Sequence, residues 1–197
     1  ASVVEASSQA YGQCRESRRT VTLIKGPDGQ TFALDIFRVK GGSRHDYRLF
    51  SDLASSDASD GELRFEDIEM PPEPPLPDIG ASVADEDIFG LRDTRTVDCP
   101  GAPWRAVWKQ RGRRYRLWML SQADAVQASN GPGQKSRNQA GRRVRYLGAV
   151  RTGEDLASCF VAVHEPSGLR GKMPVRKAVR LTVPSHAGPD AVAIKIE

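Results

Sequence analysis

The chain has 197 residues, of which 39% are hydrophobic and 7% aromatic, and its formal net charge at pH 7 is +4. This length suits one domain with a substantial core, and the composition excludes a fully disordered chain. No run of about 18 apolar residues is present, so the sequence predicts no membrane-spanning helix. Three cysteines, an odd number without CxxC spacing, exclude a disulfide framework.

The N-terminal quarter predicts strands joined by tight turns. β-branched residues are frequent, apolar side chains alternate between two faces, and glycine and proline stand between the runs. The predicted elements are a strand at 19–25, a turn at 26–29, a strand at 31–39, a turn at Gly41 and Gly42, and a strand at 45–50. We therefore expect residues 19–50 to form an antiparallel meander.

Residues 51–103 form an acidic segment with 14 acidic and 3 basic side chains. Its centre, MPPEPPLP from Met70 to Pro77, excludes helix and central strand, and predicts an extended path. Aromatic and apolar residues resume at Ile88 and Phe89. We interpret the segment as an ordered, proline-rich surface excursion within the same domain, with a recognition motif as the alternative, rather than as a linker.

Residues 104–151 are basic, with 12 basic and 1 acidic side chains. From here on, short alternating runs return, interrupted by a Gly-, Ser- and Asn-rich loop at 129–141. The predicted strands are 104–109, 113–120, 143–150, 158–165, 175–183 and 190–197. Many short strands without a helical period indicate an all-β fold, an antiparallel β-sandwich that forms one domain over residues 1–197.

The most distinctive stretch is DIFRVKGGSRHDY, from Asp35 to Tyr47. It resembles the β-sandwich of the heparinase II/III-like polysaccharide lyases, and SCFVAVHEP, from Ser158 to Pro166, resembles it more weakly. The resemblance covers residues 11–50 and 104–197 and leaves the acidic insertion unplaced. It implies the C-terminal β-sandwich of such a lyase, and we expect the chain to be a fragment of a larger protein.

The resemblance implies a parent enzyme that cleaves uronic-acid-containing polysaccharides by β-elimination. In that reaction a base removes the C5 proton, an acid protonates the leaving oxygen, and a positive group stabilises the enolate. In the family, tyrosine and histidine of an N-terminal helical toroid and of the early sandwich do this work, and the histidines of a divalent-metal site also precede the portion seen here. We therefore expect this portion alone to be inactive and to hold no metal or other cofactor. The implied partners are the toroid domain and acidic polysaccharide, and the implied location is periplasmic, cell-surface or secreted.

Two residues within the chain are candidates for catalysis. His45 and Tyr47 share one face of a predicted strand, where they could act as an acid–base pair at a cleft. The favoured alternative is a packed motif in which the histidine bonds a backbone carbonyl. His45, His164 and His186 match no metal-ligand spacing, so the sequence predicts no metal site.

Two further acidic groups predict structural roles. Asp35 stands among apolar residues and requires a partner, which we expect to be an arginine. The available arginines are Arg18, Arg19 and Arg38. His164 and Glu165 are neighbours, so in a strand they face opposite sides and do not form a pair.

The stretch KQRGRRYRLW, from Lys109 to Trp118, interleaves arginine with aromatic residues, as polyanion-binding surfaces do. Its candidate residues are Arg111, Arg113, Arg114 and Arg116. A solvated strand face that pairs with the acidic segment explains the pattern equally well. Besides the lyase sandwich, a stand-alone binding module for acidic carbohydrate is the main alternative. Nucleic-acid binding ranks last, because the adjacent acidic segment opposes a polyanion-binding surface.

Overall fold

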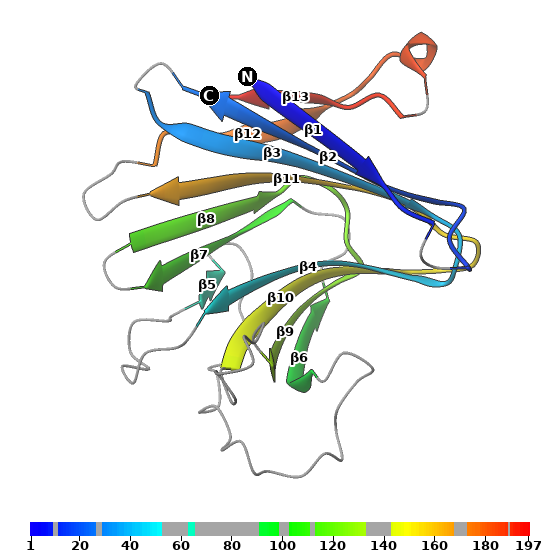
Figure 1. The fold of residues 1–197 in the computed structure, drawn as a ribbon, viewed down its shortest axis with the longest axis horizontal. Coiled ribbons are helices and arrows are strands. Elements are labelled where there is room, and N and C mark those ends of the chain that lie inside the picture. Colours follow the sequence, from blue (N-terminus) through cyan, green and yellow to red (C-terminus); the bar gives the residue numbers. More distant parts are fainter. Residues whose placement is uncertain are drawn as a thin grey trace.

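Two antiparallel sheets pack face to face in the computed structural model, and a two-stranded ribbon lies over the outer face of the larger sheet (Figure 1). The structure describes residues 1–9, 12–26, 29–52, 63–65, 91–98, 103–110, 113–132, 143–167, 173–188 and 190–197. This arrangement confirms the predicted all-β fold and the antiparallel sandwich. Within these ranges, no helix is long and apolar enough to cross a membrane.

The larger sheet contains seven of the described strands, in the order β1-β2-β3-β11-β8-β7-β5. Their bounds are Ser2–Ser7 (β1), Glu16–Lys25 (β2), Thr31–Lys40 (β3), Ala157–Ser167 (β11), Arg113–Met119 (β8), Trp104–Gln110 (β7) and Leu63–Phe65 (β5). Every neighbouring pair is antiparallel. The strand β11, from the C-terminal third of the chain, therefore lies at the centre of the sheet.

The smaller sheet contains four described strands, in the order β4-β10-β9-β6. Their bounds are Arg44–Asp52 (β4), Arg143–Thr152 (β10), Ala125–Pro132 (β9) and Arg92–Asp98 (β6). The ribbon consists of β12 (Ala178–Leu181) and β13 (Ala193–Ile196), joined through a single 3-10 turn at Ser185–Ala187. Both ribbon strands are shorter than the sequence predicts.

Two apolar cores lie on opposite faces of β11. Phe160 and Ala162 belong to the core between the two sheets, whereas Val161 and Val163 belong to the core beneath the ribbon. All four are fully buried. Successive side chains of a strand point to opposite faces, so a strand that is covered on both sides needs a continuous apolar run. This explains why residues 159–163 are apolar without interruption.

The predicted meander over residues 19–50 is wrong at its third strand. β2 and β3 form the predicted hairpin, but β4 pairs with β10 in the other sheet. Gly41 and Gly42, with φ of 96° and 83°, carry the chain from one sheet to the other. A Cβ on Gly41 would lie 2.5 Å from the carbonyl oxygen of Gln13, so this turn requires glycine. Turn residues indicate where a strand ends but not which sheet the next strand joins.

Four of the described strands fall where the sequence predicts none, and the first of them is β1, at Ser2–Ser7. β5 and β6 lie within the predicted excursion at 51–103, and β9 runs into the predicted loop at 129–141. In β9, Gly131 is a close-packing position rather than a turn, because a Cβ there would lie 2.7 Å from Leu91 Cδ2. The proline-rich run from Met70 to Pro77 lies outside the described residues.

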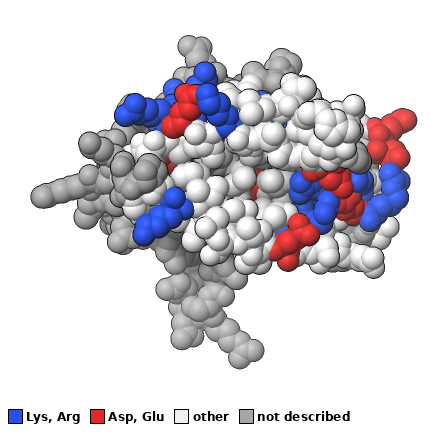
Figure 2. Space-filling model, turned by 90° about the horizontal axis from the view of Figure 1, so that it is seen from above, with Lys and Arg blue, Asp and Glu red and all other residues white. Residues whose placement is uncertain are grey.

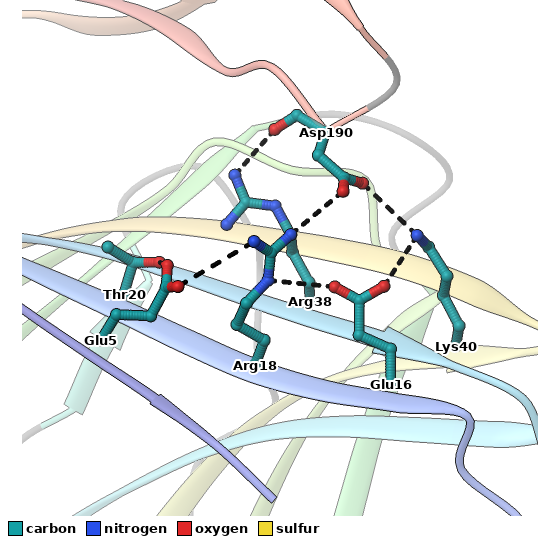
Figure 3. A network of polar contacts seen from close by, with 7 residues as sticks. All are labelled: Glu5, Glu16, Arg18, Thr20, Arg38, Lys40 and Asp190. Atoms are coloured by element: carbon teal, nitrogen blue, oxygen red, sulfur yellow. Dashed lines mark hydrogen bonds and ion pairs between the residues drawn. The ribbon is translucent and has the colours of Figure 1, made fainter.

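An ionic clamp fastens the ribbon to the larger sheet (Figure 3). The Asp190 carboxylate, just before β13, accepts a hydrogen bond of 3.0 Å from Arg18 and lies 3.4 Å from Lys40 Nζ. Its backbone carbonyl accepts a 2.8 Å hydrogen bond from Arg38. Desolvation opposes ionisation of Asp190, but the cations of β2 and β3 outweigh it and hold the pKa of this carboxyl below its usual value.

The clamp generates a prediction about local stability. We expect Asp190→Asn to speed amide hydrogen exchange in β13 by about two- to fivefold, because exposed ion pairs contribute modestly and this one holds the ribbon only locally. Exchange in β3 should not change. Asp155→Asn is the matched control, since it removes an exposed ion pair with Arg15 away from the ribbon, and asparagine tolerates the φ of 43° at that position. Equal exchange in β13 of both variants would contradict the clamp.

Candidate functional site

Five polar side chains meet between the two sheets, beside β4. They are Arg19 of β2, Asp35 of β3, Tyr47 of β4, Tyr115 of β8 and His164 of β11. The strand registers bring them to one face, because Asp35 lies opposite Ala162, two residues before His164, and Tyr115 lies opposite Pro166, two residues after it. We call this group the inter-sheet cluster.

Hydrogen bonds join the cluster in one chain. The Tyr47 hydroxyl donates to Asp35 Oδ2 at 2.7 Å and lies 2.8 Å from His164 Nε2. The other ring nitrogen of His164, Nδ1, bonds the Tyr115 hydroxyl. Because the Tyr47 hydroxyl donates its hydrogen bond to Asp35, its oxygen is the acceptor for the Nε2–H group of His164. Nδ1 of the neutral imidazole then accepts a hydrogen bond from the Tyr115 hydroxyl. The three hydrogen bonds therefore run in one direction, from Tyr115 through His164 and Tyr47 to the Asp35 carboxylate.

Asp35, the last acceptor in this series of hydrogen bonds, forms an ion pair with Arg19. The Arg19 guanidinium donates to the carboxylate in a fork, with Nε 2.9 Å from Oδ1 and Nη2 2.5 Å from Oδ2. Arg19 also lies over the rings of Phe37 and Tyr47, 5.9 and 5.4 Å from their centroids. The predicted ion pair of Asp35 is therefore present, and Arg19 is the partner among the three arginines that the sequence offers.

The cluster shifts the pKa values of its members in opposite directions. Burial alone would raise the pKa of Asp35, but the His164 ring, whose Nε2 lies 3.4 Å from Oδ2, and the hydrogen bonds from Arg19 and Tyr47 hold it well below the usual range. Burial raises the pKa of the Tyr47 phenol far above its usual value and raises that of Tyr115 as well. Both phenols therefore stay protonated at neutral pH, as hydrogen-bond donors rather than bases.

His45 has partners of its own. Its ring is buried, with Nδ1 2.8 Å from Ser158 Oγ and Nε2 2.6 Å from the carbonyl oxygen of Gly41. His45 thus ties the Gly41 turn to β11, as in the predicted packing role for this histidine. Tyr47, the other candidate, lies on the same face of β4 but belongs to the inter-sheet cluster.

A second carboxylate, Glu165, lies on the opposite face of β11, as the alternation predicts for a neighbour of His164. Glu165 is 1% exposed and accepts from Arg116 Nε at 2.6 Å, Trp118 Nε1 at 2.8 Å and the Val175 amide at 2.7 Å. Arg116 also donates to the Val175 carbonyl and lies over the Trp118 ring. The bonds of Glu165 attach the segment before β12 to the sheet, a role that the sequence pattern did not reveal.

The polyanion candidates differ in where the structure places them. The Arg116 side chain is 14% exposed and bound to internal partners. Arg113 and Arg114 lie in β8, and Arg111 lies outside the described residues. On the face that carries the ribbon, Figure 2 shows basic and acidic side chains interleaved rather than gathered in a patch of one sign. That face, in its described part, has no polyanion footprint.

Potential metal ligands are dispersed in the described part of the chain. No group of three or more His, Cys, Asp or Glu side chains comes together there. His45 and His164 each use both ring nitrogens in protein hydrogen bonds.

The comparisons with known proteins add no assignment. No protein-family model matches the chain, and no curated protein matches it significantly in sequence. The class that the geometry defines is an all-β protein in which two stacked antiparallel sheets are joined by a buried polar cluster.

Removal of the Tyr47 hydroxyl tests the cluster. We expect Tyr47→Phe to lower the free energy of unfolding by about 1–3 kcal/mol, because the ring is retained while Asp35 and His164 both lose a buried partner. Denaturant unfolding followed by fluorescence gives the value. An unchanged free energy of unfolding in Tyr47→Phe would contradict the assignment.

The depressed pKa of Asp35 predicts a pH dependence. A carboxyl whose folded pKa lies below its unfolded value, about 3.9, contributes stability above that value and loses it as the pH falls through the folded pKa. We expect Asp35→Asn to be less stable at pH 7 and to lose stability less steeply than the unmodified chain between about pH 5 and pH 2. Unfolding curves at several pH values measure both. Parallel pH profiles would show that the Asp35 ion pair contributes nothing.

Proposed function

We propose that this chain is the non-catalytic β-sandwich portion of a heparinase II/III-like lyase, an enzyme that cleaves uronic-acid-containing polysaccharides by β-elimination. One observation carries the proposal. Three polar residues of the stretch on which the resemblance rests, Asp35, His45 and Tyr47, form bonds inside the sandwich itself. They serve the fold of the domain rather than a reacting substrate.

Each part of that stretch has a structural task. Asp35 receives Arg19 and Tyr47 between the sheets, and Gly41 and Gly42 turn the chain from one sheet to the other. His45 then bonds the carbonyl of that turn. A sequence stretch that specifies the junction of two sheets supports a shared sandwich architecture, and fold alone does not carry activity.

The chemistry of the cluster supports an accessory role. β-Elimination moves the C5 proton of the uronic acid to a base, forms a double bond between C4 and C5, and breaks the bond from C4 to the leaving oxygen. The base must be unprotonated at the working pH. Tyr47 and Tyr115 have raised pKa values and donate to internal partners, so they do not suit that role. We assign the catalytic groups to the toroid and the early sandwich of the parent enzyme.

The proposal includes an acidic polysaccharide as partner. Guanidinium groups match carboxylates and sulfates in bidentate geometry, so Arg111, Arg113 and Arg114 remain the proposed contacts. Arg116 is excluded from this role by its bonds to Glu165 and Val175. No cofactor is proposed for this portion, and the location follows the polymer, outside the cytoplasm.

An assay on the chain with alginate, heparin and chondroitin sulfate tests the proposal. We expect no release of unsaturated uronate, followed by its ultraviolet absorbance, and weak binding that decreases with salt, measured by calorimetry. Replacement of Arg111, Arg113 and Arg114 by alanine should lower the affinity by about tenfold at low salt.

A matched control separates specific contacts from net charge. Arg176, Lys177 and Arg180 are exposed and sit in or beside the ribbon, so their replacement by alanine removes the same charge elsewhere. Equal losses of affinity in both triple variants would reject the arginine contacts. Product release by the chain alone would overturn the non-catalytic assignment. Tight binding of neutral as well as acidic glycans would favour the stand-alone carbohydrate-binding module instead.

A further inference from the structure

The first strand of the larger sheet has an open edge. β1 is the terminal strand of the sheet, and among the described residues only β2 pairs with it. All six of its residues are exposed, and its register with β2 runs without a bulge. Natural edge strands are commonly protected from further pairing by lysine, proline or a bulge. The sequence of β1, SVVEAS, has none of these features and contains a single charge, Glu5.

An apolar strip adjoins this edge. In the register of β1 with β2, Val4 lies opposite Val21 and Ser2 lies opposite Leu23, so the three apolar side chains share one face. They are 69%, 36% and 50% exposed, in the order Val4, Val21, Leu23. This is the face that carries Asp35 on β3, and the exposure of the three side chains shows that the smaller sheet leaves this part of β1 and β2 uncovered.

The chemistry of the strip indicates a protein partner. Its side chains are aliphatic, whereas sugar platforms use aromatic rings and polyanion sites use cations. The area is a few hundred Å², below the roughly 1,200 Å² that stable interfaces bury, so contact through the face alone is insufficient. An interface here must also use the backbone hydrogen-bonding groups along the edge of β1, as in β-strand addition.

We propose that a second copy of this chain pairs with the first through β1, antiparallel, about a two-fold axis that passes through Val4. The larger sheet then continues from one copy into the other. Val4 lies opposite Val4 of the second copy, and the strips of both copies form one apolar row. On the other face, Val3 lies opposite Glu5 of the second copy.

The choice of register follows from geometry and charge. Paired residues must share a face, so the axis passes through a residue and not between two. An axis through Glu5 would place two carboxylates opposite each other, which is unfavourable. An axis through Val3 would place Val4 opposite Ser2 of the second copy, whereas one through Val4 brings the two apolar strips together.

The proposed contact is isologous, since the same patch serves both copies, and it closes at two. The assembly is therefore a dimer and not a fibre. Because the interface is small, we expect a concentration-dependent equilibrium with a dissociation constant in the micromolar range.

Sedimentation velocity of the full chain over a range of concentrations tests the proposal. Val4→Lys places two ammonium groups opposite each other at the axis and should weaken dimerisation by about tenfold or more. Val3→Lys is the matched control, because Val3 is 61% exposed on the same strand but its lysine would face Glu5 of the second copy. Dimerisation of this variant should be unchanged or stronger. Circular dichroism checks that both variants fold.

A cross-link tests the register directly. Directly opposed residues of an antiparallel pair have Cα atoms about 4.5–5.5 Å apart, within disulfide range. Val4→Cys should therefore give a covalent dimer under mild oxidation, whereas Val3→Cys and the unmodified chain should not. A chain that stays monomeric at high micromolar concentration overturns the proposal and leaves the strip to another segment or protein. Equal weakening by Val3→Lys and Val4→Lys also overturns it, because it would show unspecific apolar association.

Discussion

The buried carboxylate of Asp35 determines how the two sheets meet. A carboxylate inside a protein is tolerated only when donors satisfy it, and the donors of Asp35 come from different strands. Arg19 reaches it within the larger sheet, whereas Tyr47 reaches it from the smaller sheet and also bonds His164. Apolar contacts between sheets tolerate small sliding movements, but a hydrogen-bonded carboxylate does not, since each bond has a direction. The cluster thus gives one relative placement of the sheets a clear preference.

Carboxylates that accept hydrogen bonds from different elements also attach the ribbon of β12 and β13 to the larger sheet. Glu165, on the opposite face of β11, receives Arg116, Trp118 and the Val175 amide, and Asp190 receives cations from β2 and β3. Carboxylates therefore attach the smaller sheet to the larger sheet and the larger sheet to the ribbon. Two of these carboxylates, Asp35 and Glu165, lie in apolar surroundings. In this arrangement Asp35, Glu165 and Asp190 attach elements of the fold to one another.

Local sequence signals predicted much of the fold. Alternating apolar residues and glycine-containing turns indicated most strands and the sandwich class, because those signals act over a few residues. They could not assign β4 to its sheet, since Gly41 and Gly42 specify a turn in either case. β9 was missed, and its end was assigned to a loop because Gly131, a turn signal in sequence, is present for packing against Leu91, a residue distant in sequence.

The site was predictable only in its parts. The apolar surroundings of Asp35 indicated an ion pair, and strand alternation placed His164 and Glu165 on opposite faces. The meeting of Tyr47 and Tyr115 at His164 depends on pairings that span 117 and 49 residues, and no local pattern encodes those. The three arginines near Asp35 were equivalent in sequence, and only the strand face that each one occupies separates them. Arg19 of β2 lies on the face of Asp35, whereas Arg18 of β2 and Arg38 of β3 lie on the face toward Asp190.

The central position of β11 has a consequence for folding. β3 ends at Lys40, and its partner β11 begins at Ala157, so the middle of the larger sheet closes only after most of the chain has been made. Pairing of strands so distant in sequence makes folding slow, whereas the entropy of closing a loop grows only logarithmically with its length. A long acidic insertion between β4 and β7 therefore adds little to the closure penalty. During synthesis, the β3 edge of the hairpin of β2 and β3 therefore stays unpaired until β11 has been made.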